Sequence, residues 1–207
     1  MTDSNAVPGF RPSVHGLHFA NLFPPGPTVK LGPIDPRWIG IGDASSGLCG
    51  GMSWLVRERF EAGKPIADDR EAPANGSPLF RTIVRRQVLS LDWMRGPLRF
   101  WIAAARGPKA SDAHTRTRAL PQVQTAIDAG RLPMVGLVRH TGWSPFALTK
   151  DHQLLAYAYA TDGATGAVTI RLYDPNWPDR DDVTITVDAF GLRQNSGEPL
   201  LGFFVLD

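Results

Sequence analysis

Cysteine is almost absent from this sequence, because the 207 residues include only one, Cys49. A lone cysteine excludes a framework of internal disulfides. It suits a reducing compartment, and equally a secreted protein that has no disulfides. Its thiol is therefore either a buried structural group or a reactive one, and the neighbouring residues distinguish these two cases.

Long hydrophobic runs and a marked charge of one sign are also missing. No segment approaches the roughly 18 apolar residues that a membrane-spanning helix needs, and residues 1–14 lack the apolar centre of a signal peptide. The 22 basic and 20 acidic residues leave a formal net charge of +2, which gives no sign of a nucleic-acid partner. We expect a soluble protein without a membrane span, cytoplasmic by default, with export by another route left open. The sequence does not predict the oligomeric state.

The composition is that of an ordinary globular protein, with 43% hydrophobic and 20% charged residues, and the length fits one domain. Neither an internal repeat nor a low-complexity linker divides the chain. We therefore expect a single domain over residues 1–207, with an N-terminal arm and short strands (1–46), a helical half (47–130) and an antiparallel β half (131–207).

Hydrophobic periodicity separates the two halves. Apolar residues at three- and four-residue steps predict helices, and alternating or continuous short apolar runs between turn residues predict strands. Ser45 or Ser46 could cap the first of these helices. Helices followed by strands indicate the α+β class. The expected helices cover residues 48–62, 79–92, 97–106 and 120–129, and the expected strands cover 133–138, 152–160, 168–173, 183–187 and 200–206.

Cys49 falls in the first turn of a predicted helix, next to Gly50 and Gly51. The partial positive charge and unsatisfied N–H groups of a helix start stabilise a thiolate and lower its pKa. The two glycines carry no side chain that would keep a substrate backbone away. The other interpretation is a structural cysteine behind a glycine-rich turn, since free cysteines are often buried.

His152 is the histidine whose position suggests a partner. Gly163 lies midway between His152 and Asp174 in a predicted turn, so a symmetric hairpin would place the two side chains together at the end of one apolar face. We expect Asp174 to accept the Nδ1–H of the imidazole and to leave Nε2 for the thiol. A shift of one residue in the register would put His152 on the wrong face. The alternative is an incidental hydrogen-bonded pair at the end of a hairpin.

The order of these segments resembles that of the papain-like cysteine peptidase superfamily. A cysteine opens a helix in Gly47 to Trp54, a histidine opens a strand in Asp151 to Tyr157, and an Asp-Pro closes the next strand in Leu172 to Asn176. The resemblance is closest to the bacteriocin-processing peptidases, whose third catalytic residue is also an aspartate followed by proline. It covers residues 47–66 and 152–174, and it does not extend to the first 40 residues.

The resemblance implies a papain-like fold, with the cysteine at a helix start packed on a C-terminal antiparallel sheet. It implies that Cys49 is the nucleophile, His152 its base and Asp174 the residue that orients the histidine, in a hydrolase that cleaves a peptide or other amide bond without a cofactor. The superfamily has an oxyanion-binding glutamine six residues before the cysteine, but this chain has Asp43 there, and a carboxylate would repel an oxyanion. The remaining donors are the Cys49 N–H and the hydroxyl of Ser45 or Ser46. The alternative is a weak or inactive papain-like protein that binds a peptide or a partner protein.

Three further patterns bear on the site. Trp143 and Trp177 fall in expected loops near the site and could line a substrate cleft, although tryptophans more often belong to a core. The acidic run 174–182 lacks the spacing of a calcium loop. His15, His18 and Cys49 do not have a zinc spacing, so we expect no metal.

Overall fold

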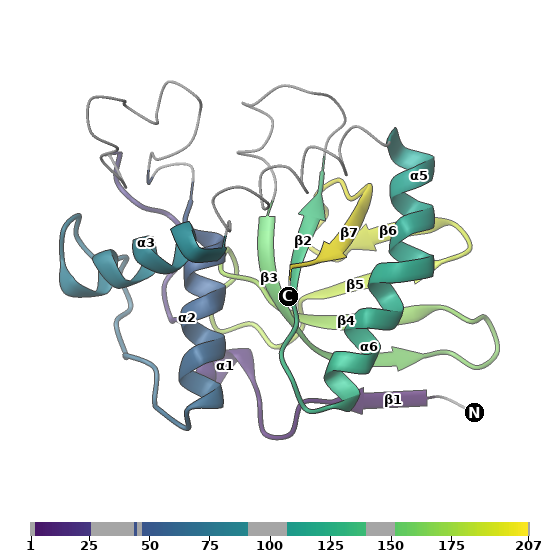
Figure 1. Ribbon diagram of the computed structural model, residues 1–207, viewed down its shortest axis with the longest axis horizontal. Helices are drawn as coiled ribbons and strands as arrows, with labels where there is room; N and C mark the ends of the chain where they lie inside the picture. Colours follow the sequence, from purple (N-terminus) through teal and green to yellow (C-terminus); the bar gives the residue numbers. More distant parts are fainter. Residues whose placement is uncertain (1–2, 26–43, 45–46, 91–106, 140–151, 207) are drawn as a thin grey trace.

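A curled antiparallel sheet forms the centre of the computed structural model, which describes residues 3–25, 44, 47–90, 107–139 and 152–206 (Figure 1). In these ranges the sheet has seven strands, six of them in the order β6-β5-β4-β3-β2-β7, while β1 pairs with β3. The strands are β1 (Asp3–Ala6), β2 (Met134–Val138), β3 (His152–Thr161), β4 (Val168–Tyr173), β5 (Thr184–Asp188), β6 (Gly191–Gln194) and β7 (Gly202–Val205).

Strand β3 is the middle of the sheet. One edge pairs antiparallel with β2 near His152 and with β1 near Thr161, and the other edge pairs with β4. Its residues from 152 to 159 are all buried, as expected for a strand with neighbours on both sides and helices packed around it. The N-terminal arm thus contributes the strand β1, for which the sequence predicted short strands without their bounds.

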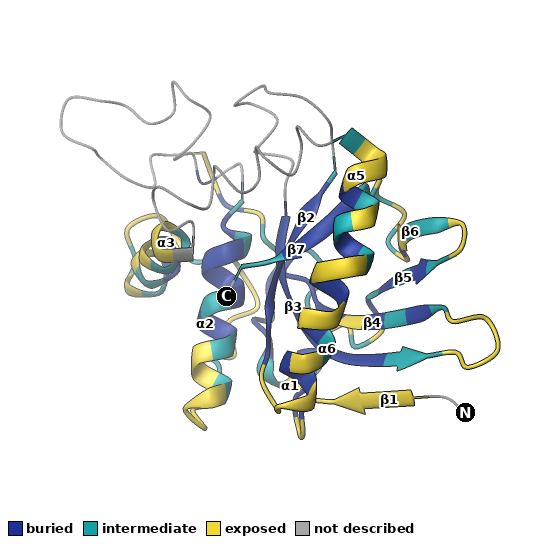
Figure 2. Ribbon diagram, turned by 45° about the vertical axis from the view of Figure 1, so that its right-hand side comes forward, coloured by how far each residue is buried: buried dark blue, intermediate teal, exposed yellow. Residues whose placement is uncertain are grey.

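Two groups of helices flank the sheet. In Figures 1 and 2, α2 (Cys49–Glu61) and α3 (Pro78–Ser90) lie on one side of β3, while α5 (Gly107–His114) and α6 (Leu120–Asp128) lie on the other. A short helix, α1 (Pro12–His15), lies in the arm. Helices were expected at α2, α3 and α6, and strands at β2, β3, β4, β5 and β7, so the structure confirms the α+β class. The expected helix over 97–106 lies outside the described residues.

The helix containing residue 120 begins earlier than the sequence predicted. Helix α5 starts at Gly107, and a π-helical turn over Thr115–Ala119 joins it to α6. Pro121 has no N–H to offer the carbonyl of Thr117. The preceding turn is wide, and the N–H of Leu120 donates to the carbonyl of Thr115, five residues back. Helix α5 is rich in polar residues and therefore lacks the apolar periodicity by which a helix is predicted.

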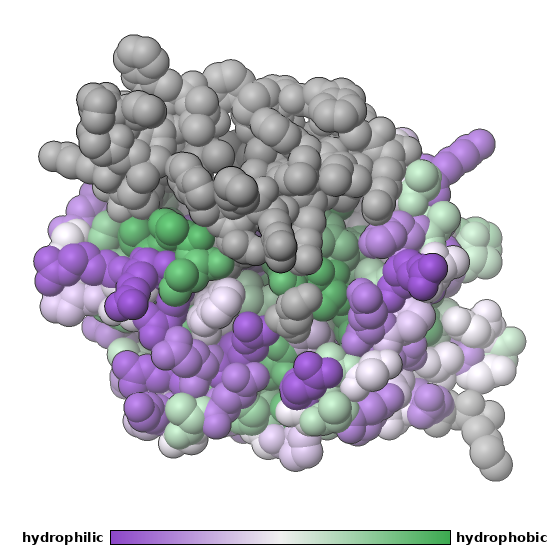
Figure 3. Space-filling model, viewed as in Figure 1, coloured by the Kyte–Doolittle hydropathy of each residue, from purple (hydrophilic) through white to green (hydrophobic). Residues whose placement is uncertain are grey.

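The main cluster of buried side chains draws on both halves of the chain. Met52, Leu55 and Val56 line the inner face of α2 with exposures of 0, 2 and 0%, and burial of one such side chain stabilises the fold by about 1.5–3 kcal/mol. Figure 2 shows buried positions facing the sheet and exposed ones on the outer helix surfaces. Among the described residues in Figure 3, polar side chains cover most of the visible face, with smaller hydrophobic areas between them. Among the described helices, none is long and apolar enough to cross a membrane.

Candidate active site

Cys49 is the first residue of α2, as expected, and the residue as a whole is partly exposed. The residue before it, Leu48, occupies the N-cap position and has no side-chain cap bond. The expected capping by Ser45 or Ser46 is therefore wrong, because Leu48 is the N-cap residue and the helix begins at Cys49. Asn21 takes over part of this role from a distant segment, since its Oδ1 accepts the N–H of Leu48 at 2.6 Å.

The two glycines after Cys49 are buried in the first turn of α2. At Gly51 an added Cβ would lie 2.2 Å from the carbonyl oxygen of Ile83 and 2.9 Å from the backbone nitrogen of Gln87. The backbone of α3 therefore occupies the space that was expected to admit a substrate. The absence of a side chain at Gly51 serves the close packing of two helices, which corrects the expectation of a cleft there. Gly50 is buried beside it.

Helix α2 reaches the sheet at the end of β3, beyond the last paired residue of β4. There the N–H of Gln153 donates to the Sγ of Cys49 at 3.3 Å, and the Oγ of Ser53 donates to the Gln153 carbonyl at 3.2 Å. These side chains satisfy backbone groups that a neighbouring strand would otherwise bind. The edge of β3 thus fixes the position of the sulfur, one residue from His152.

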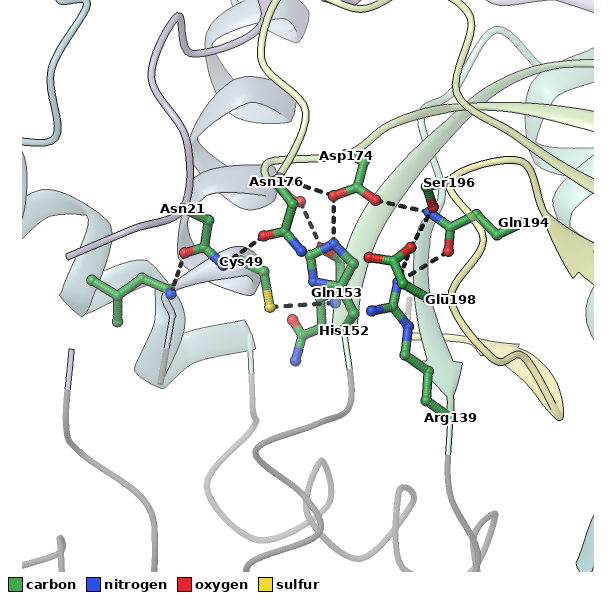
Figure 4. Close-up of polar contacts among 12 residues, drawn as sticks. Asn21, Cys49, Arg139, His152, Gln153, Asp174, Asn176, Gln194, Ser196 and Glu198 are labelled. Carbon is green, nitrogen blue, oxygen red and sulfur yellow. Dashed lines mark hydrogen bonds and ion pairs between the residues drawn. The ribbon is translucent and has the colours of Figure 1, made fainter. Parts of the chain in front are cut away.

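His152 begins β3, is 4% exposed and lies between Cys49 and Asp174 (Figure 4). Its Nε2 is 2.5 Å from the Oδ1 of Asp174. This is the reverse of the arrangement expected from the sequence, in which Nδ1 faces the carboxylate and Nε2 the thiol. Since Nε2 faces the carboxylate, Nδ1 is the nitrogen left for the thiol, whose interaction with His152 helps to raise the pKa of the histidine.

The hairpin brings the two residues together by a different register from the symmetric one. In a symmetric hairpin Thr161 would pair with Thr165, but it pairs with Val168. This shift by itself would put Asp174 on the wrong face of the sheet. A β-bulge between Ala156 and Ala158 then changes the register by one residue, so that Leu155 pairs with Tyr173. This places Asp174 diagonal to His152 and on the same face.

Asp174 is held from three directions and is only 1% exposed. Besides facing His152, its Oδ1 accepts the N–H of Asn176 at 2.9 Å, and its Oδ2 accepts the Nε2 of Gln194 at 2.9 Å. Gln194 in turn accepts a bond from the Nη2 of Arg139 at 3.0 Å. These contacts satisfy both oxygens of a buried carboxylate, which would otherwise be costly to ionise.

The charges of the three residues stabilise one another. Burial opposes the charged form of His152, but the charges of Asp174 and Cys49 and their hydrogen bonds outweigh it and raise its pKa to about 10. Burial likewise disfavours the Cys49 thiolate, yet His152 and the N–H of Gln153 hold its pKa below the usual value. The pKa of Asp174 is lowered too, because His152, Asn176 and Arg139 outweigh its burial. These interactions favour the imidazolium form of His152 and shift Cys49 toward the thiolate.

Sequence reasoning missed the residues that support this arrangement. Asn21 donates to the Oδ1 of Asn176 at 3.2 Å, which links the start of α2 to the loop after β4. Asn176 could have been suspected, because an Asp-Pro-Asn turn places a backbone N–H near the Asp carboxylate. Asn21, Arg139 and Gln194 come from distant segments that carry no motif, and no signal in the sequence marks them.

The other expected site residues are placed as follows. Trp177 is half-buried against the core with the guanidinium of Arg180 5.4 Å from its ring centroid, and its backbone N–H donates to the carbonyl of Asp174 at 2.9 Å. It thus packs against the body of the protein beside the site. Asp43, Ser45, Ser46 and Trp143 lie outside the described residues.

The acidic run after Asp174 is used within the protein. Asp179 contacts His18 and Arg70, and Asp181 accepts bonds from Ser13. Asp182 pairs with Arg180. In the described part of the chain, no three His, Cys, Asp or Glu side chains lie close enough together to hold a metal ion.

Comparison of the chain with protein-family models, with curated proteins and with solved structures found no match. The chemistry open to the site therefore follows from the geometry of its own residues. A nucleophilic sulfur, a histidine beside it and a buried carboxylate behind the histidine can together perform nucleophilic catalysis on an acyl group.

Proposed function

We propose that this protein is a papain-like cysteine hydrolase that cleaves a peptide or other amide bond through an acyl-enzyme. The observation that carries the proposal is the position of the His152 imidazole between the Cys49 thiol and the Asp174 carboxylate, with Nε2 2.5 Å from Oδ1. A nucleophile, a base within hydrogen-bond reach and a third group that orients the base are the parts that such catalysis requires.

The electrostatics favour the reactive form of the nucleophile. The pKa of Cys49 is lowered by His152, and that of His152 is raised to about 10 chiefly by Asp174, against the opposing effect of burial in both cases. Because the thiolate is the attacking species, a lowered thiol pKa increases its population at neutral pH. The partial positive charge at the start of α2 acts in the same direction.

In the acylation step, the Cys49 Sγ donates an electron pair to the carbonyl carbon of the amide, and a tetrahedral oxyanion forms. Its collapse breaks the carbon–nitrogen bond, and the His152 imidazolium gives its proton to the leaving amine. The products of this step are a thioester on Cys49, a free amine and a neutral imidazole.

In the deacylation step, the neutral imidazole removes a proton from water, and the oxygen attacks the thioester carbon. The carbon–sulfur bond then breaks and releases the acid, with the sulfur leaving as the thiolate beside the imidazolium. Asp174 is ionised throughout and keeps the imidazole in one orientation, since it binds Nε2 while Nδ1 works. No metal or cofactor enters this cycle.

The order of the segments supports the papain-like assignment. A cysteine at a helix start is packed against the end of the central strand β3 of an antiparallel sheet. Later in the chain the histidine begins β3 and the aspartate directly follows the adjacent strand β4. A fold does not fix a substrate, so peptidase, amidase and acyl-transfer activities share this proposal.

The test is the pH dependence of Cys49 alkylation by iodoacetamide in the folded protein and in His152→Ala. We expect the wild-type thiol to titrate well below about 8.5, and the variant to lose that shift. His18→Ala is the matched control, because His18 also pairs with an aspartate, Asp179, but lies outside the site. An inert thiol, or identical titrations in wild type and His152→Ala, would contradict the hydrolase and favour a protein that only binds its partner.

A further inference from the structure

The side-chain oxygen of Gln153 is an unused hydrogen-bond acceptor inside the candidate active site. The residue is 3% exposed, and its Oε1 is closed off from water and has no hydrogen-bond partner in the described part of the chain. Buried polar atoms without a partner are rare in folded proteins and call for an explanation. A donor that a ligand brought to Oε1 would form a hydrogen bond there without having to displace water.

This amide lies next to the nucleophile. The backbone N–H of Gln153 donates to the Sγ of Cys49 at 3.3 Å, and Figure 4 shows its side chain on the cysteine side of His152, away from Asp174. Cys49 is partly exposed, so a substrate that reaches the sulfur comes close to the amide as well.

The other amide and carboxylate oxygens around the sulfur already accept hydrogen bonds. Asn21 accepts the N–H of Leu48 at 2.6 Å, and Gln87 accepts an N–H from the first turn of α2 at 2.7 Å. Both oxygens of Asp174 are engaged. Among the described residues, the Oε1 of Gln153 is thus the amide oxygen beside the sulfur that remains available to a ligand.

The strand β3 places this acceptor and the proton donor of the reaction on opposite sides. Gln153 follows His152 in β3, and consecutive side chains of a strand point to opposite faces. In the proposed acylation step, the leaving amine has to lie beside the imidazole that protonates it. The acyl part of the substrate therefore extends from the sulfur away from the imidazole, to the side on which the Gln153 amide lies.

We propose that the Oε1 of Gln153 accepts a hydrogen bond from the acyl part of the substrate, from the backbone N–H of the residue whose carbonyl carbon Cys49 attacks. The substrate class is then a peptide or another N-acylated amino acid, since a simple carboxamide has no N–H at that place. Gln153 is a specificity-determining residue of this site. The inference rests on the proposed hydrolase chemistry and narrows its range of substrates.

The test compares two esters that differ at one position. N-acetylglycine p-nitrophenyl ester carries the N–H, and acetoxyacetic acid p-nitrophenyl ester has an oxygen in its place. Each acylates Cys49 and releases p-nitrophenolate, whose absorbance gives the rate, and mercaptoethanol gives the ratio of the two rates that the esters show by themselves. We expect the wild-type protein to exceed this reference ratio, in favour of the N–H, by about 10–100-fold. The reactivity of the thiol cancels from the ratio, because both esters react with the same sulfur.

Two variants assign the preference to Oε1. Gln153→Met has a similar volume but no acceptor, and its ratio should fall to within about threefold of the reference. Gln153→Glu keeps an acceptor at the same position and should keep the preference for the N–H, although its charge changes both rates. Gln122→Met, at an exposed position of α6, is the matched control and should behave as the wild type. Thermal unfolding reports whether each variant is folded, and the wild-type ratio needs no variant.

A wild-type ratio equal to that of mercaptoethanol, or an unchanged preference in Gln153→Met, would overturn the role of Gln153 and leave the hydrolase intact. A preference that is lost in Gln153→Glu would also overturn it, because the amide would then act as a donor. A thiol that iodoacetamide alkylates but neither ester acylates would instead refute the hydrolase, and the substrate assignment with it.

Discussion

Gln194 donates its side-chain N–H to the carboxylate oxygen of Asp174 that does not face His152, at a distance of 2.9 Å. Both residues are buried, with exposures of 4 and 1%. The amide oxygen of Gln194 accepts a hydrogen bond from the guanidinium of Arg139. The glutamine therefore links this cation to the Asp174 carboxylate, which faces His152. It is a positioning residue, since it acts on the imidazole only through Asp174.

Gln194→Leu should destabilise the protein. The substitution leaves a buried carboxylate oxygen and a partly buried guanidinium without their common partner, and we expect the free energy of unfolding to fall by about 1–3 kcal/mol. Urea unfolding at pH 7 measures this change. Gln122→Leu, on the exposed surface of α6, should stay within about 0.5 kcal/mol of wild type, and equal stabilities of the two variants would show that the buried bond contributes nothing.

Asp174→Asn should narrow the pH range in which His152 is charged. The pKa of His152 is about 10, and after the opposing effect of burial the charge of Asp174 is the largest cause of its elevation. An imidazolium attracts the anionic reagent iodoacetate, so the wild-type alkylation rate should fall as the pH rises through about 10. Without the carboxylate the pKa of His152 is lower, and the same fall should occur at lower pH.

Neutral iodoacetamide is the control for this experiment, because its reaction depends much less on the charge of His152. We expect little decrease of its rate at high pH in either protein. If the iodoacetate rate falls at the same pH in the wild type and in Asp174→Asn, the carboxylate does not set the pKa of the histidine.

Gly51→Ala should disturb the packing of α2 on α3. The new Cβ would lie 2.2 Å from the carbonyl oxygen of Ile83, so one helix has to move, at a cost of about 1–3 kcal/mol in the free energy of unfolding. Gly63→Ala tests backbone strain alone, since its Cβ would meet open space but its φ is +61°, and about 1 kcal/mol is expected. A smaller effect at Gly51 than at Gly63 would argue against close helix contact.

Asn21→Ala should loosen the start of α2. The variant loses the acceptor for the Leu48 N–H and the bond to Asn176, and the loss of a comparable capping bond costs about 1 kcal/mol of stability. Thermal unfolding measures the difference against Leu22→Ala, a neighbouring change at a side chain that is 78% exposed. Equal melting temperatures for the two variants would contradict the bridging role of Asn21.

Much of the fold could be predicted because its longer elements carry strong patterns. The inner face of α2 and the buried run of β3 follow helical and strand periodicity, and their residues are indeed buried. Strand β1 could not be found in this way, since its four residues are all exposed and show no alternation. Strand β6 is equally short.

The site was predictable to the level of its three central residues and no further. Cys49, His152 and Asp174 stand at element ends whose patterns can be recognised, and the structure brings them together. Which ring nitrogen faces the carboxylate depends on the rotamer of His152, which spacing does not encode. Gln194 and Arg139 reach Asp174 only through the tertiary fold, so local patterns could not reveal them.

The bulge between Ala156 and Ala158 lies between the site and the turn of the β3–β4 hairpin. The pairing between the bulge and His152 puts the histidine and Asp174 on the same face of the sheet. The turn at 162–166, at the other end of the hairpin, is exposed throughout. Extra residues inserted in that turn would bulge into solvent and leave the pairing of β3 with β4 unchanged. We therefore expect that an epitope or a surface-attachment peptide can be grafted at 162–166 without moving His152 and Asp174.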